Sequence, residues 1–113
     1  MWNVITTRLF DSWYEQQTES LQDAVLAALK ILREFGPHLG RPLVDTVRES
    51  GYPNMKELRI QFCGHPVRAF FAFDPERRAI VLCAGDKTGV NEKRFYKEMI
   101  RCADAEFSHH LKK

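Results

Sequence analysis

This chain of 113 residues lacks the features that mark secreted, membrane-bound or disulfide-stabilised proteins. Its three cysteines, Cys63, Cys83 and Cys102, are odd in number and have no paired spacing, so we expect reduced thiols and a cytoplasmic protein. No apolar run approaches the roughly 20 residues that cross a bilayer. The N-terminal segment has no basic stretch followed by an apolar signal core. We therefore expect neither membrane insertion nor secretion.

Motifs for metal or nucleotide chemistry are also missing. Cys63-Gly-His65 is too compact for an ordinary zinc pair, and no second pair follows it. His109 and His110 are adjacent residues in an expected helix, so their side chains point apart. The segment Gly85-Asp-Lys-Thr-Gly89 lacks the spacing and the parallel-sheet context of a phosphate-binding loop. We expect no metal, no cofactor and no cysteine nucleophile.

The size and the charge of the chain are those of one small globular domain spanning residues 1–113. Net charge is +2, but the charges are unevenly distributed. Residues 1–50 contain five Lys or Arg and seven Asp or Glu, whereas residues 51–113 contain twelve and eight. A solvated surface explains this asymmetry as well as an anionic partner does.

The first half of the chain predicts a short strand and two helices. Residues Trp2–Thr6 alternate weakly, as a strand does, and a helical apolar face follows after Thr7. Ser20 and Asp23 resemble a capping box at the start of a second helix, which Gly36-Pro37 ends. The apolar stripes predict an antiparallel, core-forming helix pair; they contain Leu9, Phe10, Trp13, Tyr14, Leu21, Val25, Ala28, Leu29 and Leu32.

The second half predicts an antiparallel meander and a last helix. A short edge strand at Val44–Val47 precedes it. Leu58, Ile60 and Phe62 alternate with Glu57, Arg59 and Gln61. Turns at 63–66 and 74–78 separate this strand from the apolar runs Val67–Phe73 and Ala79–Ala84. Asn91 is a good cap for a final helix whose buried face contains Phe95, Met99, Ala103 and Phe107. The fold class is therefore α+β.

Basic side chains and one tyrosine along these strands are candidates for binding a phosphodiester. Arg68 is the most informative, because a charge inside an apolar strand is costly unless it is paired or faces a cleft. A structural ion pair with Glu57 or Asp86 is the alternative explanation. Arg59 and Lys56 lie on or beside the preceding strand, and Lys87 follows the third. Four further side chains are also candidates, although each has an ordinary explanation as a core or solvated residue: Tyr96, Lys93, Lys97 and Arg101.

Four segments together resemble a bacterial toxin family, the HigB-like, phage Gp49-related branch of the RelE/ParE toxins. They are Gly36-Pro-His-Leu-Gly-Arg-Pro42, Asn54-Met-Lys-Glu-Leu-Arg59, Arg68-Ala-Phe-Phe-Ala-Phe-Asp-Pro75 and Ala84-Gly-Asp-Lys87. The resemblance covers essentially the whole chain. It implies a small curved antiparallel sheet, two N-terminal helices on one face and a C-terminal helix.

The resemblance also implies a function and a set of site residues. The expected activity is metal-independent, ribosome-dependent cleavage of mRNA, restrained by a HigA-like helix-turn-helix antitoxin; the pair of proteins is further expected to bind operator DNA. Arg68, Lys87, Tyr96 and Lys56 correspond to catalytic positions, with Arg59 as an RNA contact, and the basic helix edge of Lys93, Lys97 and Arg101 is a further candidate contact. The histidine-rich arrangement of some HigB members is absent from the segment 84–90, so the general base stays open.

Two other functions fit the same sequence. A ParE-like protein inhibits a topoisomerase by binding it, without catalysis, and the same fold serves both roles. A phage-derived binding module that is no longer toxic is the third interpretation. Arg68, Lys87 and Tyr96 favour the nuclease.

Overall fold

Five strands of the computed structural model, which describes residues 1–113, form one sheet in the order β1-β5-β4-β3-β2. The strands are β1 (Asn3–Thr6), β2 (Val44–Thr46), β3 (Lys56–Phe62), β4 (His65–Phe73) and β5 (Arg78–Asp86). The helices are α1 (Arg8–Glu15), α2 (Glu19–Phe35) and α3 (Glu92–Leu111), with a 3₁₀ turn, η1 (Gly36–His38). No helix combines the length and the apolarity needed to cross a bilayer.

The α+β class and the antiparallel meander of β3, β4 and β5 are confirmed. Strand β2 pairs antiparallel with β3 at the edge. Strand β1 departs from the expected all-antiparallel sheet, because it runs parallel to the first half of β5, with Asn3 opposite Arg78.

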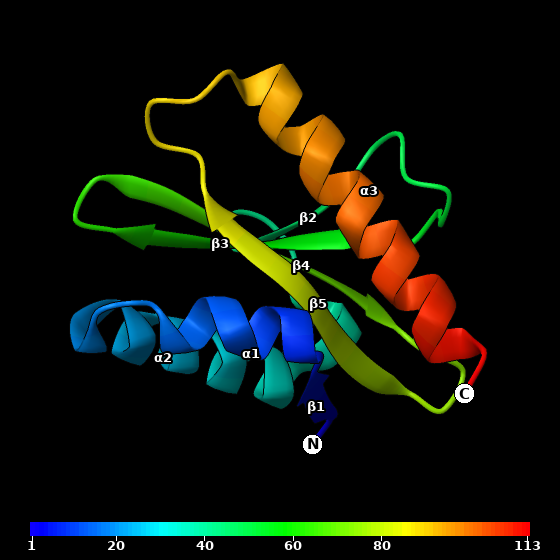
Figure 1. Ribbon diagram of the computed structural model, residues 1–113. Coiled ribbons are helices and arrows are strands. Elements are labelled where there is room, and N and C mark those ends of the chain that lie inside the picture. Colours follow the sequence, from blue (N-terminus) through cyan, green and yellow to red (C-terminus); the bar gives the residue numbers. More distant parts are fainter.

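Helices cover both faces of the sheet (Figure 1). The antiparallel pair α1 and α2 lies against one face, and α3 crosses the other face diagonally. Each face therefore has its own apolar core. The core under α1 and α2 includes Phe10, Val25, Leu32, Leu58 and Phe71. The core under α3 includes Met55, Phe70, Leu82, Ile100 and Phe107.

The start of α2 differs from the prediction. The N-cap is Thr18, whose Oγ1 accepts a hydrogen bond from the Leu21 backbone N–H at 3.3 Å. Ser20 lies inside the first turn, so the predicted capping box with Asp23 is wrong. Thr18 prevails because its backbone is extended, as an N-cap requires. The other predicted signals hold, since α2 ends at Gly36 with positive φ and Asn91 caps α3.

A polar row crosses the face of the sheet beneath the first turns of α3. On β3, Glu57 and Arg59 face α3, whereas Leu58 and Ile60 face α1 and α2. Arg59 lies opposite Arg68 of β4, which in turn lies opposite Gly85 of β5. Gly85 lets α3 approach closely, because a Cβ there would be 3.1 Å from Phe95 Cε1.

Candidate functional site

The centre of this polar row is a buried carboxylate between a phenol and a guanidinium. The Tyr96 hydroxyl donates to Glu57 Oε1 at 2.6 Å, and Arg68 Nε lies 3.7 Å from the same oxygen. Glu57 is 5% exposed and Arg68 9%. Such burial is tolerated because the two charges are opposite. Arg68 Nη1 donates to the Val67 carbonyl, but Nε has no hydrogen-bond partner.

Tyr96 remains a hydrogen-bond donor over a wide pH range. Burial raises the pKa of its phenol to about 12; the hydrogen bond to Glu57 and the charge of Glu57 add to the effect, and Arg68 opposes it. The ring packs edge-on against Phe70 and Phe95, which fixes its orientation. A protonated phenol is therefore held against a carboxylate beside a buried cation.

Lys87 brings a second cation to the same place. Its Nζ lies over the Tyr96 ring, 5.2 Å from the centroid, and 2.5 Å from Glu92 Oε1. The hydrogen bond from Lys87 lowers the pKa of Glu92, and the charges of Lys87 and Arg68 lower it further. Lys87 and Arg68 thus both act on one carboxylate at the start of α3. Only Lys87 contacts Glu92 directly, and Arg68 acts on it through its charge. Both positive charges thus favour an anion at this position.

The remaining strand cations lie at the β2 side of the row. Arg59 Nη2 is 3.2 Å from Asp45 Oδ2 and 3.5 Å from Glu57 Oε2, so Arg59 touches the cluster through Glu57. Lys56 does not join it. Since neighbouring strand residues alternate, Lys56 faces away from Glu57, and its Nζ donates to Thr46 Oγ1 at 2.8 Å.

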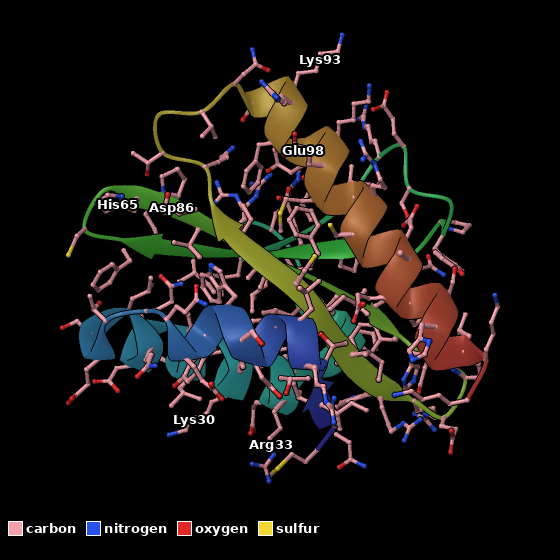
Figure 2. All side chains as sticks on the ribbon, viewed as in Figure 1. Lys30, Arg33, His65, Asp86, Lys93 and Glu98 are labelled. Atoms are coloured by element: carbon pink, nitrogen blue, oxygen red, sulfur yellow. The ribbon has the colours of Figure 1, made fainter.

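The basic helix edge of Lys93, Lys97 and Arg101 is exposed. Figure 2 shows Lys93 at the outer end of α3, projecting away from the sheet. These cations are separate from the buried cluster, on the helix that carries Tyr96. They can contact an extended anionic chain that reaches the cluster.

Sequence reasoning left two members of the cluster without a functional role. Of the two partners considered for Arg68, the structure selects Glu57; Asp86 instead accepts from Thr88. The bond between Glu57 and Tyr96 had no signal, since it joins residues of different elements that meet only because of the path of α3. Glu92 was likewise missed, although its place next to a helix cap beside Lys87 is a readable cue.

Residues that suggest metal or thiol chemistry are dispersed. No three His, Cys, Asp or Glu side chains gather as a metal site would require. His109 is exposed, and His110 Nε2 instead lies 2.9 Å from Asp74 Oδ2. Cys83 is buried and its pKa is raised by burial, whereas Cys63 and Cys102 are exposed.

A hollow of about 940 Å³ lies elsewhere, between the start of α1 and the end of α3. In its wall, Asp74 accepts hydrogen bonds from Arg78 at 2.8 and 2.9 Å. Burial by itself raises the pKa of Asp74, but hydrogen bonds from His110 and Arg78 lower it to about 2. None of Arg68, Lys87 and Tyr96 lines this hollow, so the cluster around Arg68 is the better candidate for the predicted site.

The overall fold matches that of a solved bacterial toxin. A mutant of the Escherichia coli toxin RelE in the free state superposes with a TM-score of 0.63 over 88% of this chain and 96% of that one, at 11% identity. The crystal structure of the isolated E. coli RelE toxin gives 0.62 over 89% and 97%, at 13% identity. The chain therefore has a RelE-like α+β fold, as predicted.

Sequence comparisons identify the family within that fold. The family model "Phage derived protein Gp49-like (DUF891)" matches residues 12–108. Two Mycobacterium tuberculosis H37Rv proteins are similar: "Putative toxin HigB2", 45% identical over 97% of this chain and 54% of that protein, and "Putative toxin HigB3", 44% identical over 89% and 86%. The chain thus spans about half the length of the first relative. It belongs to the phage-derived Gp49-like family, which confirms the Gp49-related, HigB-like resemblance. The likeness to RelE is one of fold.

Proposed function

We propose that this chain is the toxin of a type II toxin–antitoxin pair and cuts mRNA on the ribosome. The observation that carries the proposal is the convergence of Arg68 and Lys87 on Tyr96 and two carboxylates. Support comes from the toxin names of the two mycobacterial relatives and from the RelE-like fold.

The proposed reaction is attack of a ribose 2′-hydroxyl on the adjacent phosphorus. The 2′-oxygen forms a bond to phosphorus while the bond to the 5′-oxygen breaks, leaving a 2′,3′-cyclic phosphate and a 5′-hydroxyl. Arg68 and Lys87 stabilise the negative charge that develops on the phosphoryl oxygens. Each contact of this kind contributes roughly 3–4 kcal/mol to lowering a barrier.

Glu57 and Tyr96 are the base and the acid that we propose for the proton transfers. Glu57 takes the proton of the 2′-hydroxyl, and Tyr96 gives its proton to the leaving 5′-oxygen. Because Tyr96 donates to Glu57 at 2.6 Å, the proton on Glu57 then returns to Tyr96, and both groups regain their starting states. Lys56, which the resemblance placed among the catalytic positions, lies on the opposite face of the sheet, so we propose Glu57 as the base.

The wider surface and partners follow from the same proposal. Arg59, Lys93, Lys97 and Arg101 contact RNA phosphates outside the cluster. A HigA-like helix-turn-helix antitoxin restrains the toxin, and the pair binds operator DNA. The place of action is the cytoplasm, where ribosomes read mRNA.

Translation-dependent cleavage of a reporter mRNA tests the proposal. The double variant Arg68→Ala, Lys87→Ala removes both central cations and should lose at least about 10³-fold of the cleavage rate. Its charge-matched control is Lys30→Ala, Arg33→Ala, two exposed cations that lie on α2 far from α3 (Figure 2). The control should cleave at the wild-type rate, at the same codon-linked positions.

Two results would reject the nuclease assignment. One is equal cleavage by the wild type and the Arg68, Lys87 double variant. The other is growth arrest with DNA breaks and no mRNA ends, which is the behaviour of a topoisomerase inhibitor.

A further inference from the structure

The segments Cys63–His65 and Gly85–Gly89, which match neither a metal site nor a nucleotide-binding loop, lie together at one end of the sheet. His65 lies at the start of β4, after the turn that begins at Cys63, and Asp86 ends β5. Figure 2 shows His65 and Asp86 beside each other at that end. His65 Nδ1 lies 3.2 Å from Asp86 Oδ2 and 2.9 Å from Thr88 Oγ1.

Asp86 ties the segment on both sides of Lys87. Its Oδ1 accepts from the Thr88 backbone N–H at 2.9 Å and from the Thr88 hydroxyl at 2.6 Å. Burial alone raises the pKa of Asp86, but the bonds from Thr88, with the charge of His65, lower it below its usual range. The Lys87 backbone N–H donates to the Pro66 carbonyl at 3.1 Å. Residues 86–88 are thus joined to residues 65–66 by backbone and side-chain bonds.

These bonds limit the conformations that the backbone can adopt at Lys87. Lys87 begins an irregular loop that reaches α3 only at Glu92, and Gly89 within that loop has a positive φ. Its Nζ must nevertheless stay over the Tyr96 ring. A chain leaving a strand into such a loop has many conformations, so the direction of the Lys87 side chain depends on what holds its backbone.

We propose that His65, Asp86 and Thr88 form a clasp that positions Lys87 against Tyr96 and Arg68. This inference rests on the proposed function, because it describes how that same site is held ready. The contacts are half-exposed, with side-chain exposures of 47% for His65 and 39% for Asp86. Pairs of this kind add little to stability. The clasp therefore acts through the position of Lys87, and its loss changes activity far more than folding.

Variants that mimic one ring nitrogen at a time test the clasp. The amide nitrogen of asparagine takes the place of His65 Nδ1, whereas that of glutamine takes the place of Nε2. His65→Asn should keep the bond to Asp86 and stay within about twofold of wild-type kcat/KM, and His65→Gln should lose roughly tenfold. Thr88→Ser and Thr88→Val form a second matched pair, with and without the hydroxyl.

A double-mutant cycle shows whether His65 acts through Lys87. In a Lys87→Ala background, His65→Gln should cause no further loss of cleavage, because there is no ammonium left to position. A full additional tenfold loss in this background would show that His65 acts independently of Lys87 and would overturn the clasp.

An NMR readout decides the question without any RNA. Because Lys87 Nζ lies over the Tyr96 ring, the neighbouring methylene protons should have upfield ring-current shifts in the wild type and in His65→Asn. These shifts should collapse in His65→Gln. Unchanged ring-current shifts in His65→Gln would refute the clasp. A collapse without any change in cleavage would keep the clasp and remove Lys87 from the proposed reaction.

Discussion

Glu57 is the residue on which the proposed chemistry depends, and it is buried between a donor and a cation. Replacing Glu57 by Gln keeps its shape but removes its charge and its ability to accept a proton. We expect cleavage to fall by about 10²-fold or more. Glu34→Gln, at an exposed position on α2, is the charge-matched control.

Replacing Glu57 by Gln should also change the titration of the Tyr96 phenol. Since Glu57 helps raise the pKa of Tyr96 to about 12, Tyr96 stays protonated in the wild type up to about pH 11. Wild type and Tyr96→Phe should therefore show the same phenolate absorbance rise up to that pH. In Glu57→Gln the pKa of Tyr96 falls, and an additional phenol should ionise; equal titrations would contradict the coupling.

In the proposed reaction, Glu92 competes with an RNA phosphate for Lys87. The Glu92 carboxylate lies 2.5 Å from the Lys87 ammonium in the free protein, so a phosphate that binds Lys87 must displace it. Glu92→Gln should bind a 2′-O-methyl RNA oligonucleotide, which cannot be cut, about five-fold more tightly at low salt. Glu98→Gln, on the same helix and paired only with Arg94, should bind like the wild type. Weaker or unchanged binding by Glu92→Gln would show that Lys87 takes no phosphate.

Among elements, α3 matters most, since it carries Tyr96 over the sheet and Gly85 sets how closely it approaches. Gly85→Ala places a Cβ 3.1 Å from Phe95 Cε1 and 3.5 Å from Met99 Sδ. The first turns of α3 must move outward, which lengthens the contact of Tyr96 with Glu57. We expect roughly tenfold slower cleavage and a loss of about 1 kcal/mol of stability. Gly40→Ala, where no atom lies within 4 Å, is the control, and equal rates for the two variants would refute this role of Gly85.

Most elements could be predicted because their periods are strong. The apolar stripe of α2 and the alternation in β3 leave little choice of structure. The parallel pairing of β1 could not be foreseen, because four weakly alternating residues do not specify a neighbour so distant in the chain. The capping error had a similar cause, since Thr18 and Ser20 both offer a hydroxyl, and only the backbone conformation separates them.

For the whole molecule, Asp74 joins the hairpin between β4 and β5 to the end of α3. Its pKa of about 2 in the folded state lies below the ordinary value of 3.8, so the folded state binds fewer protons there. The stabilisation is fully present above about pH 4 and is lost as the pH falls towards about 2. Asp74→Asn should cost about 1–2 kcal/mol near neutral pH, measured by urea unfolding. The difference from wild type should shrink in acid, and a difference that is constant with pH would contradict this origin.

The site was partly readable from the sequence. Arg68 was conspicuous as a charge in an apolar strand. Lys87 and Tyr96 were candidates from their positions alone, and the resemblance favoured a catalytic role for them. Strand alternation already placed Glu57 and Arg59 on one face, so the opposite orientation of Lys56 followed from the same pattern. What no local pattern contains is the diagonal path of α3, which decides that Tyr96 meets Glu57.

The pairing of Asn3 with Arg78 sets an order on assembly during synthesis. The ribosome releases the N-terminal strand long before its neighbour exists, so the sheet edge stays open until β5 has emerged. The helix bearing Tyr96 comes later still. The proposed site for RNA therefore cannot form on a growing chain until α3 has left the ribosome and packed against the sheet.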